Sequence, residues 1–295
     1  ERASEGHFGV IRGHDNFEFK YWAKLPEMET SARMWLPLPE TDKSQSVEII
    51  SLNVPGDQRI VHDKKYGNRV LILDLAAEDS GKVIDIRFAV RRIEKAAYAA
   101  PKPGEIDLTP NRLGPITTEI RTTAHNAVDG KKEDLVRARA LYDHVIDRMR
   151  YIKYGEGWGK GDAVYACSVR TGNCTDFHAY FISLARAIGI PARFAIGAAI
   201  PSDRNDGGMS GYHCWVEFYA EGKWWPVDIS EADKYSALST YYFGHHPANR
   251  FEFSRGRDLE VDPLPVSGPI NFLAYPLLEV DGKLVKVDVS FTFRE

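Results

Sequence analysis

The chain lacks several features that mark specialised classes of protein. Its 295 residues include only three cysteines, Cys167, Cys174 and Cys214, so at least one thiol stays unpaired within the chain, which excludes a disulfide-stapled scaffold. No apolar run approaches the roughly 20 residues of a membrane-spanning helix. The formal net charge of −4 lacks the basic excess typical of nucleic-acid-binding proteins. We therefore expect a globular protein with no nucleic-acid partner and no membrane span.

The beginning of the chain also lacks a recognisable signal. The sequence starts at Glu1 instead of a methionine, and no signal peptide is visible. A removed leader is one explanation for such a start. The residues leave the compartment and the oligomeric state open, with an extracytoplasmic location, periplasmic or secreted, favoured over a cytoplasmic one.

The first third of the chain has the pattern of short strands. Aromatic and β-branched residues alternate with polar ones in several segments between about 17 and 93, and turn residues separate these segments. The segments are Phe17–Trp22, Ala32–Leu36, Val47–Val54, Arg69–Leu75 and Val83–Val90. This spacing predicts a β-sandwich. We find no catalytic constellation here, which favours a structural or substrate-positioning module.

The residue pattern changes from strand-like to helical after Pro101, Pro103 and Gly104, which mark a boundary. We therefore predict a β-sandwich-like domain over 1–104 and a second domain over 105–295. Residues 116–128 and 133–150 have helical composition, and the second segment carries an apolar stripe at helical spacing. A loop with four glycines follows at 155–161 and contains Trp158.

Cys174 is the residue with the clearest chemical signal. The pattern from Asn173 to Ile188 predicts a helix with one apolar face, capped by Thr171 or Asn173 and ended by Gly189. Cys174 then lies in the first turn, where unsatisfied N–H groups and the helix dipole favour a thiolate and offer donors to an oxyanion. The alternative is a buried structural cysteine.

A predicted β-hairpin carries a histidine and an acid. Residues 212–219 and 223–228 have strand composition, and Glu221-Gly222 forms a two-residue turn. If Ala220 pairs with Lys223, His213 lies opposite Ser230. Asp228 is then diagonal to His213 on the same face. In that geometry the acid orients the imidazole, which is free to take a thiol proton. Cys214 would face the other way, as a core residue.

Four separated blocks resemble the transglutaminase-like superfamily, which belongs with the papain-like cysteine peptidase fold. The blocks are Gly172–Asp176, Gly189–Arg193, Tyr212–Glu217 and Trp224–Asp228. The resemblance implies an α+β fold in which the nucleophile helix packs on an antiparallel β-sheet. It also implies that Cys174 is the nucleophile, His213 the base and Asp228 the orienting acid, acting on a protein or peptide substrate. The strand-rich region before the core and the hairpin expected around Asp281-Gly282 are similar to bacterial members.

The sequence departs from the papain-like pattern at the oxyanion site. Papain-like enzymes place a glutamine shortly before the nucleophile, whereas the glutamines of this chain, Gln45 and Gln58, lie in the N-terminal region. The N–H of Cys174 then needs another donor. The indole of Trp158 is a candidate, although it can equally form a wall or stack on substrate.

Three functions are compatible with these residues. In the first, Cys174 forms a thioester with a peptide or carboxamide carbonyl, which water or an amine resolves; no cofactor and no calcium is expected. The second is a metal site made by Cys174 with His178, joined by His213 and Cys167, but paired metal-ligand spacing is absent. The third is a non-catalytic protein- or peptide-binding module on the same fold.

Overall fold

A computed structural model describes residues 9–99 and 102–295. The contacts divide the chain into two compact units. The first contains the residues up to Glu94 together with Ile196–Tyr212 and Pro247–Glu295, and the second contains Lys95–Ala195 and His213–His246. This division is not linear along the chain, and the two domains expected at 1–104 and 105–295 stay a prediction. Pro101, part of the predicted boundary, lies outside the described residues.

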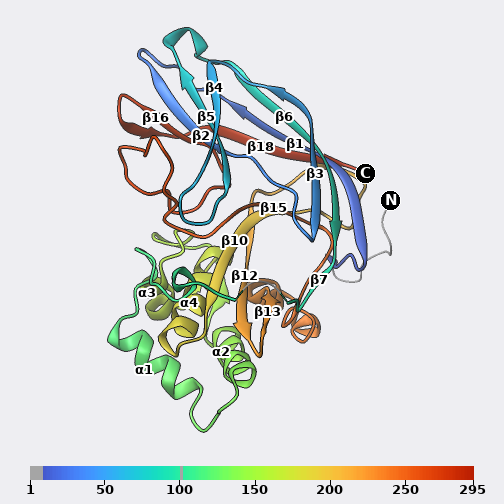
Figure 1. Cartoon of the computed structure of the whole chain (residues 1–295), viewed down its shortest axis with the longest axis vertical. Coiled ribbons are helices and arrows are strands. Elements are labelled where there is room, and N and C mark those ends of the chain that lie inside the picture. The colour runs from blue at the N-terminus through green and yellow to red at the C-terminus, as the bar shows by residue number, and fades with distance from the viewer. Residues whose placement is uncertain (1–8, 100–101) are drawn as a thin grey trace. The chain divides into compact units, whose positions relative to one another are not determined.

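Two antiparallel sheets of five strands each make up most of the first unit (Figure 1). The first sheet has the order β11 (Asp206–Gly208), β18 (Asp288–Arg294), β1 (His14–Lys24), β6 (Val83–Ile93) and β3 (Gln45–Asn53). The second has the order β17 (Lys283–Val285), β16 (Leu277–Val280), β2 (Ala32–Pro37), β5 (Arg69–Leu75) and β4 (Asp57–His62). The β-rich N-terminal region expected from the sequence is therefore present.

The C-terminal strands complete the sheets that the N-terminal strands begin. Strand β18 pairs with β1 and strand β16 pairs with β2. The expected turn at Asp281-Gly282 joins β16 to β17, and both residues have positive φ, 50° and 70°, as a tight hairpin turn requires. These pairings explain why Pro247–Glu295 belongs to the first unit.

Alternating burial along β1 creates one apolar face in the first sheet. Phe19 on that face meets Phe251 and Phe253 of β15 (Arg250–Arg255), with ring centroids 5.0 and 5.5 Å apart. Both pairs are edge-to-face, an arrangement that aromatic quadrupoles favour. The first unit therefore has an aromatic core of its own.

The second unit combines helices with an antiparallel sheet. Its helices are α1 (Thr118–Ala127), α2 (Asp134–Arg148), α3 (Ala163–Val169), α4 (Cys174–Ala187) and α5 (Ile229–Lys234). Its strands are β7 (Lys95–Ala96), β8 (Arg150–Tyr151), β9 (Thr171–Gly172), β12 (His213–Ala220), β13 (Lys223–Val227), β14 (His245–His246) and the first half of β10 (Ala192–Ala199). Strand β12 lies between β13 and β10. The whole chain is α+β, as expected.

Helix α4 is the centre of the second unit. It packs against β12 and against α1, α2 and α3 (Figure 1). All of its residues are buried, so neighbours cover the polar side of the helix as well as the apolar face that the sequence predicts. Several of its buried polar side chains are hydrogen-bonded within the protein. Arg186, for example, donates to the carbonyl oxygens of Asp107 and Ala192 at 2.9 and 2.8 Å.

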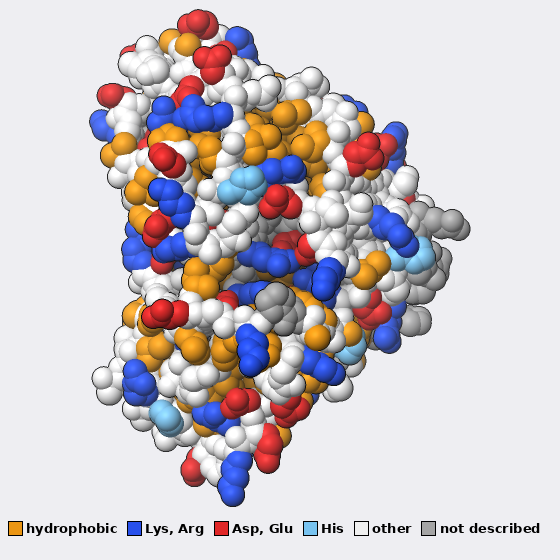
Figure 2. Space-filling view, in the orientation of Figure 1, with side chains coloured by type: hydrophobic (Ala, Val, Ile, Leu, Met, Phe, Trp, Pro, Cys, Tyr) orange, Lys and Arg blue, Asp and Glu red, His pale blue; other side chains and the backbone are white. Residues whose placement is uncertain are grey.

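The remaining predictions about local structure hold with small shifts. The helices expected at 116–128 and 133–150 are α1 and α2, each slightly shorter than predicted, whereas α3 was not anticipated. Within the described residues, no helix has both the length and the apolar character needed to cross a membrane. Figure 2 shows acidic and basic side chains interspersed over the face in view.

Candidate active site

Cys174 is the first residue of α4, as the sequence predicts. Asn173 caps the helix, and its side-chain oxygen accepts the N–H of Thr175 at 3.0 Å. The N–H of Cys174 donates no hydrogen bond within the part of the chain that the structure describes. A free N–H beside the sulfur, at the positive end of a helix, is well placed to receive an oxyanion.

The buried carboxylate of Asp176 ties the glycine loop to the start of α4. It accepts the N–H groups of Gly159 at 2.7 Å, Gly161 at 3.0 Å and Asn173 at 3.0 Å. Both glycines have positive φ, 83° and 65°, which explains the glycine content of the loop. A Cβ at Gly172 would lie 2.5 Å from a carboxylate oxygen of Asp176, so the close approach here requires glycine.

Replacing Asp176 with asparagine should destabilise the second unit. The amide NH₂ would face at least one of the three backbone donors, and a buried donor without an acceptor costs about 1–3 kcal/mol. We expect the free energy of unfolding, measured by urea denaturation, to fall by about 2–4 kcal/mol. Asp162→Asn is the matched control, because Asp162 caps α3 and asparagine is an equally good cap. Equal stability of the two variants would contradict this role.

The hairpin brings His213 and Asp228 together. Ala220 pairs with Lys223, and the register continues to Val216 opposite Val227. The expected pairing of His213 with Ser230 is wrong, because β13 ends at Val227 and residues 229–234 form α5. Asp228 caps that helix by accepting the N–H of Glu231 at 3.1 Å, so the cap fixes its carboxylate.

The imidazole of His213 lies between the acid and the thiol. Its Nε2 is 2.7 Å from Oδ2 of Asp228, and its side chain also hydrogen-bonds with Cys174. Because Nε2 faces the carboxylate, Nδ1 is the nitrogen that can face the sulfur. Burial alone would lower the pKa of His213, but the charge and hydrogen bond of Asp228 outweigh it and raise that pKa to about 9.

Cys174 has the opposite shift. Burial raises the pKa of its thiol, but hydrogen bonds from Cys214 and His213 and the positive charge of His213 outweigh burial and hold the pKa well below its usual value. These opposite shifts of the two pKa values favour a thiolate–imidazolium pair. It is nearly closed to solvent, since Cys174 is 2% exposed, His213 6% and Asp228 0%.

A second histidine, His178, lies beside Cys214, a contact that the sequence did not reveal. His178 accepts the N–H of Ile229 through Nε2 at 3.1 Å, so its proton is on Nδ1, which lies 3.4 Å from the sulfur of Cys214. Burial lowers the pKa of His178 to about 4, so the ring is neutral. Cys214 is buried as expected, but its thiol contacts Cys174 instead of facing away. Its raised pKa, caused by burial and by Cys174, keeps it a thiol that can donate to the thiolate.

Part of the chain is similar to a known protein family. Residues 121–229, which include Cys174, His213 and Asp228, match the model of the transglutaminase-like superfamily. This match places the region 121–229 of the chain in the transglutaminase-like superfamily.

Two similar proteins span most of the chain. An uncharacterized protein of Haemophilus influenzae strain Rd is 27% identical over 299 residues, which cover 84% of this chain and 80% of the relative. A solved structure from Cytophaga hutchinsonii, whose assignment as a cysteine protease is itself provisional, is 17% identical with a TM-score of 0.62. It covers 94% of this chain and 92% of its own, and it supports the fold.

Two motif residues of the transglutaminase-like region, Arg193 and Glu217, pair with each other. Arg193 donates to a carboxylate oxygen of Glu217 from Nε at 2.8 Å and from Nη2 at 2.6 Å. Lys95 and Tyr98 donate to the same carboxylate, each at 2.9 Å. The guanidinium also stacks over the ring of Trp224, 3.9 Å from its centroid. This buried network joins β10, β12 and β13, so the motif here is structural.

Trp158 lies in the glycine loop that precedes α4. Trp158 is half-buried, and its indole N–H donates no hydrogen bond among the described residues. Lys153 lies 5.9 Å from the centroid of its ring and 5.8 Å from that of Tyr151, whose pKa is raised by burial and by Cys174. Lys153 is thus a neighbour of both Trp158 and Tyr151, and the charge of Cys174 acts on Tyr151.

Cys167 lies apart from these groups. It is on α3, where its thiol hydrogen-bonds with Tyr180 and Glu119. No group of three or more His, Cys, Asp or Glu residues with metal-binding geometry occurs at residues 9–99 and 102–295. The metal site considered from the sequence, with Cys167 beside Cys174, therefore does not form in this part of the chain.

Proposed function

We propose that this protein is a thiol-dependent acyl-transfer enzyme that acts on a peptide or carboxamide carbonyl. Cys174 is the nucleophile, His213 the acid and base, and Asp228 the group that orients His213. The observation that carries the proposal is the position of His213, which hydrogen-bonds with Cys174 on one side and with Asp228 at 2.7 Å on the other.

The reaction follows from the protonation states. The thiolate of Cys174 attacks the carbonyl carbon, and the N–H of Cys174 stabilises the oxyanion that forms. The imidazolium of His213 gives its proton to the leaving nitrogen, the C–N bond breaks and a thioester remains. Neutral His213 then takes a proton from water or an amine, which attacks the thioester and releases the thiolate.

Burial favours this chemistry and limits access to it. A nearly dry site strengthens the interactions that stabilise the thiolate and the oxyanion. Because only 2% of Cys174 is exposed, a substrate carbonyl reaches the sulfur only when neighbouring residues move aside. The closed site also limits the access of water to the thioester. Low access of water is a condition for transfer to an amine.

The proposal is tested by incubating the protein with a glutamine-containing peptide and a primary amine and weighing the products. Deamidation or peptide cleavage identifies water as the acceptor, and a peptide–amine adduct identifies amine transfer. All three products require Cys174, so each should vanish in Cys174→Ala. If a range of such peptides gives none of them, the alternative of a non-catalytic peptide-binding module replaces the enzyme.

A further inference from the structure

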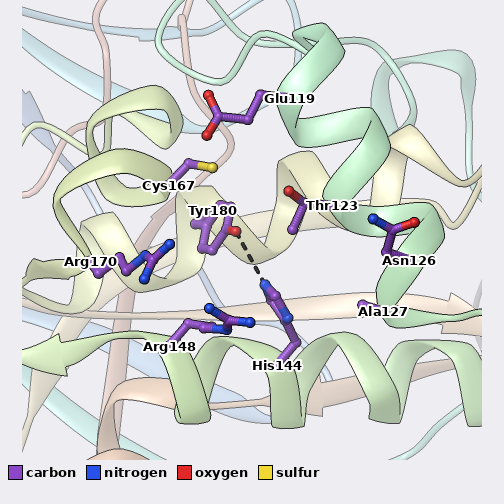
Figure 3. A pocket seen from close by; sticks show the side chains of 9 residues that line it. All are labelled: Glu119, Thr123, Asn126, Ala127, His144, Arg148, Cys167, Arg170 and Tyr180. Carbon is purple, nitrogen blue, oxygen red and sulfur yellow. Dashed lines mark hydrogen bonds between the residues drawn. The ribbon is translucent and has the colours of Figure 1, made fainter.

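A pocket lies among the helices of the second unit, and the proposed acyl-transfer chemistry does not use the residues that line it. Its volume is about 380 Å³, within the range of small-molecule sites. Side chains from α1, α2 and α4 line it, together with Cys167 of α3 and Arg170 at the end of that helix (Figure 3). Tyr180, its residue on α4, lies six positions after Cys174 along that helix.

The pocket has an ordered polar floor. The hydroxyl of Tyr180 lies 3.3 Å from Nε2 of His144 and also hydrogen-bonds with Cys167. Tyr180 is buried, and burial raises its pKa, so it remains a neutral phenol. Burial and the nearby charge of Arg148 lower the pKa of His144, so that ring is neutral as well. The floor therefore offers hydrogen bonds but no charge.

The charged side chains of opposite sign lie on different sides of the pocket. Arg148 and Arg170 both act electrostatically on His144, and neither forms an ion pair or a side-chain hydrogen bond within the described residues. Glu119 lies at the Cys167 side, where it accepts a hydrogen bond from the thiol. Figure 3 shows the carboxylate of Glu119 well separated from the guanidinium groups of Arg148 and Arg170, with Tyr180 between them.

We propose that this pocket binds a small zwitterionic ligand, an amino carboxylate. Its carboxylate would pair with Arg148 and Arg170, and its ammonium group would pair with Glu119. Arg148 and Arg170 are exposed at the pocket, where two guanidinium groups can pair with one carboxylate, whose geometry arginine matches. A dicarboxylate would place one carboxylate next to Glu119, and a diamine would place an ammonium group next to the arginines. Both arrangements are repulsive.

Three probes with chains of equal carbon number separate these cases: 5-aminopentanoate, glutarate and cadaverine. Binding to the full chain is measured by calorimetry at low ionic strength, because exposed ion pairs weaken in salt. We expect 5-aminopentanoate to bind at least about tenfold more tightly than glutarate, and cadaverine not to bind. Equal or tighter binding of glutarate, binding of cadaverine, or no binding of 5-aminopentanoate would overturn the proposal.

Variants locate the site. Arg148→Ala combined with Arg170→Asn should abolish binding of 5-aminopentanoate; asparagine is chosen because residue 170 has a φ of 60°, which asparagine tolerates. Glu119→Gln should remove the preference for 5-aminopentanoate over glutarate while glutarate still binds.

The control is Arg121→Ala, which changes an exposed arginine on α1 outside the pocket and should change neither affinity. Unchanged binding in the double variant overturns the proposal, and circular dichroism checks that each variant folds. These results do not depend on the activity of Cys174.

Discussion

Replacing Cys174 with alanine is expected to lower the rate of acyl transfer by at least about a thousandfold. The substitution removes the atom that forms the thioester, while the free N–H at the start of α4 and the rest of the site remain. Cys174→Ser should lose a similar factor, because a serine hydroxyl beside His213 does not ionise as the thiol does. The measurement is the rate of product formation from a glutamine-containing peptide that the unmodified protein converts.

The control for this prediction is a second small, buried substitution on the same helix. Ser183→Ala removes a buried hydroxyl that has no hydrogen-bond partner among the described residues, and it lies more than two turns from Cys174. Its rate should stay within about twofold of the unmodified protein. A Cys174→Ala protein that folds and keeps a rate comparable with Ser183→Ala would refute the nucleophile.

Replacing Asp228 with asparagine is expected to lower the rate by about a hundredfold to ten-thousandfold. The asparagine oxygen can still accept the N–H of Glu231 and the hydroxyl of Ser230, so the cap of α5 is kept. The amide NH₂, however, then faces Nε2 of His213 where a carboxylate stood. Nδ1 must carry the ring proton instead, and the imidazole can no longer accept a proton on the side of the thiol.

The pH dependence of this variant provides a second measurement. Asp228 raises the pKa of His213 from its ordinary value of 6.5 to about 9, so the imidazolium–carboxylate attraction stabilises the fold below about pH 6.5 and is lost as the pH rises through about 9. In Asp228→Asn the high-pH limit of activity should therefore move to lower pH, and the stability lost should be greatest below pH 6.5. A variant that keeps both the rate and the high-pH limit would show that Asp228 only caps α5.

The sequence was sufficient to predict the local elements around the candidate site. The asparagine cap, the apolar spacing and Gly189 located α4 and placed Cys174 in its first turn, because these signals act over a few residues. The two-residue turn fixed the parity of the hairpin, so His213 and Asp228 were expected on one face. Their contact then follows from geometry, even though β13 ends earlier than expected.

The remaining features depend on contacts between residues distant in sequence. Nothing near Cys214 indicates that its thiol meets Cys174, because that contact depends on how α4 packs against β12. The complete burial of α4 likewise comes from the helices α1, α2, α3 and α5 and the strand β12, which close around it. Long-range strand pairing has no local signal either, so the union of β18 with β1 could not be derived from either segment alone.

The most direct test of the thiolate–imidazolium pair is the rate at which iodoacetamide alkylates Cys174, followed by peptide mass from pH 5 to pH 9. A free cysteine, with a pKa of about 8.5, is roughly 0.3% thiolate at pH 6. With the pair in place, Cys174 should react on the order of 30- to 100-fold faster than free cysteine at pH 6, and His213→Ala should lose that advantage. A rate that rises only near pH 8.5, or that is unchanged in His213→Ala, would contradict the pair.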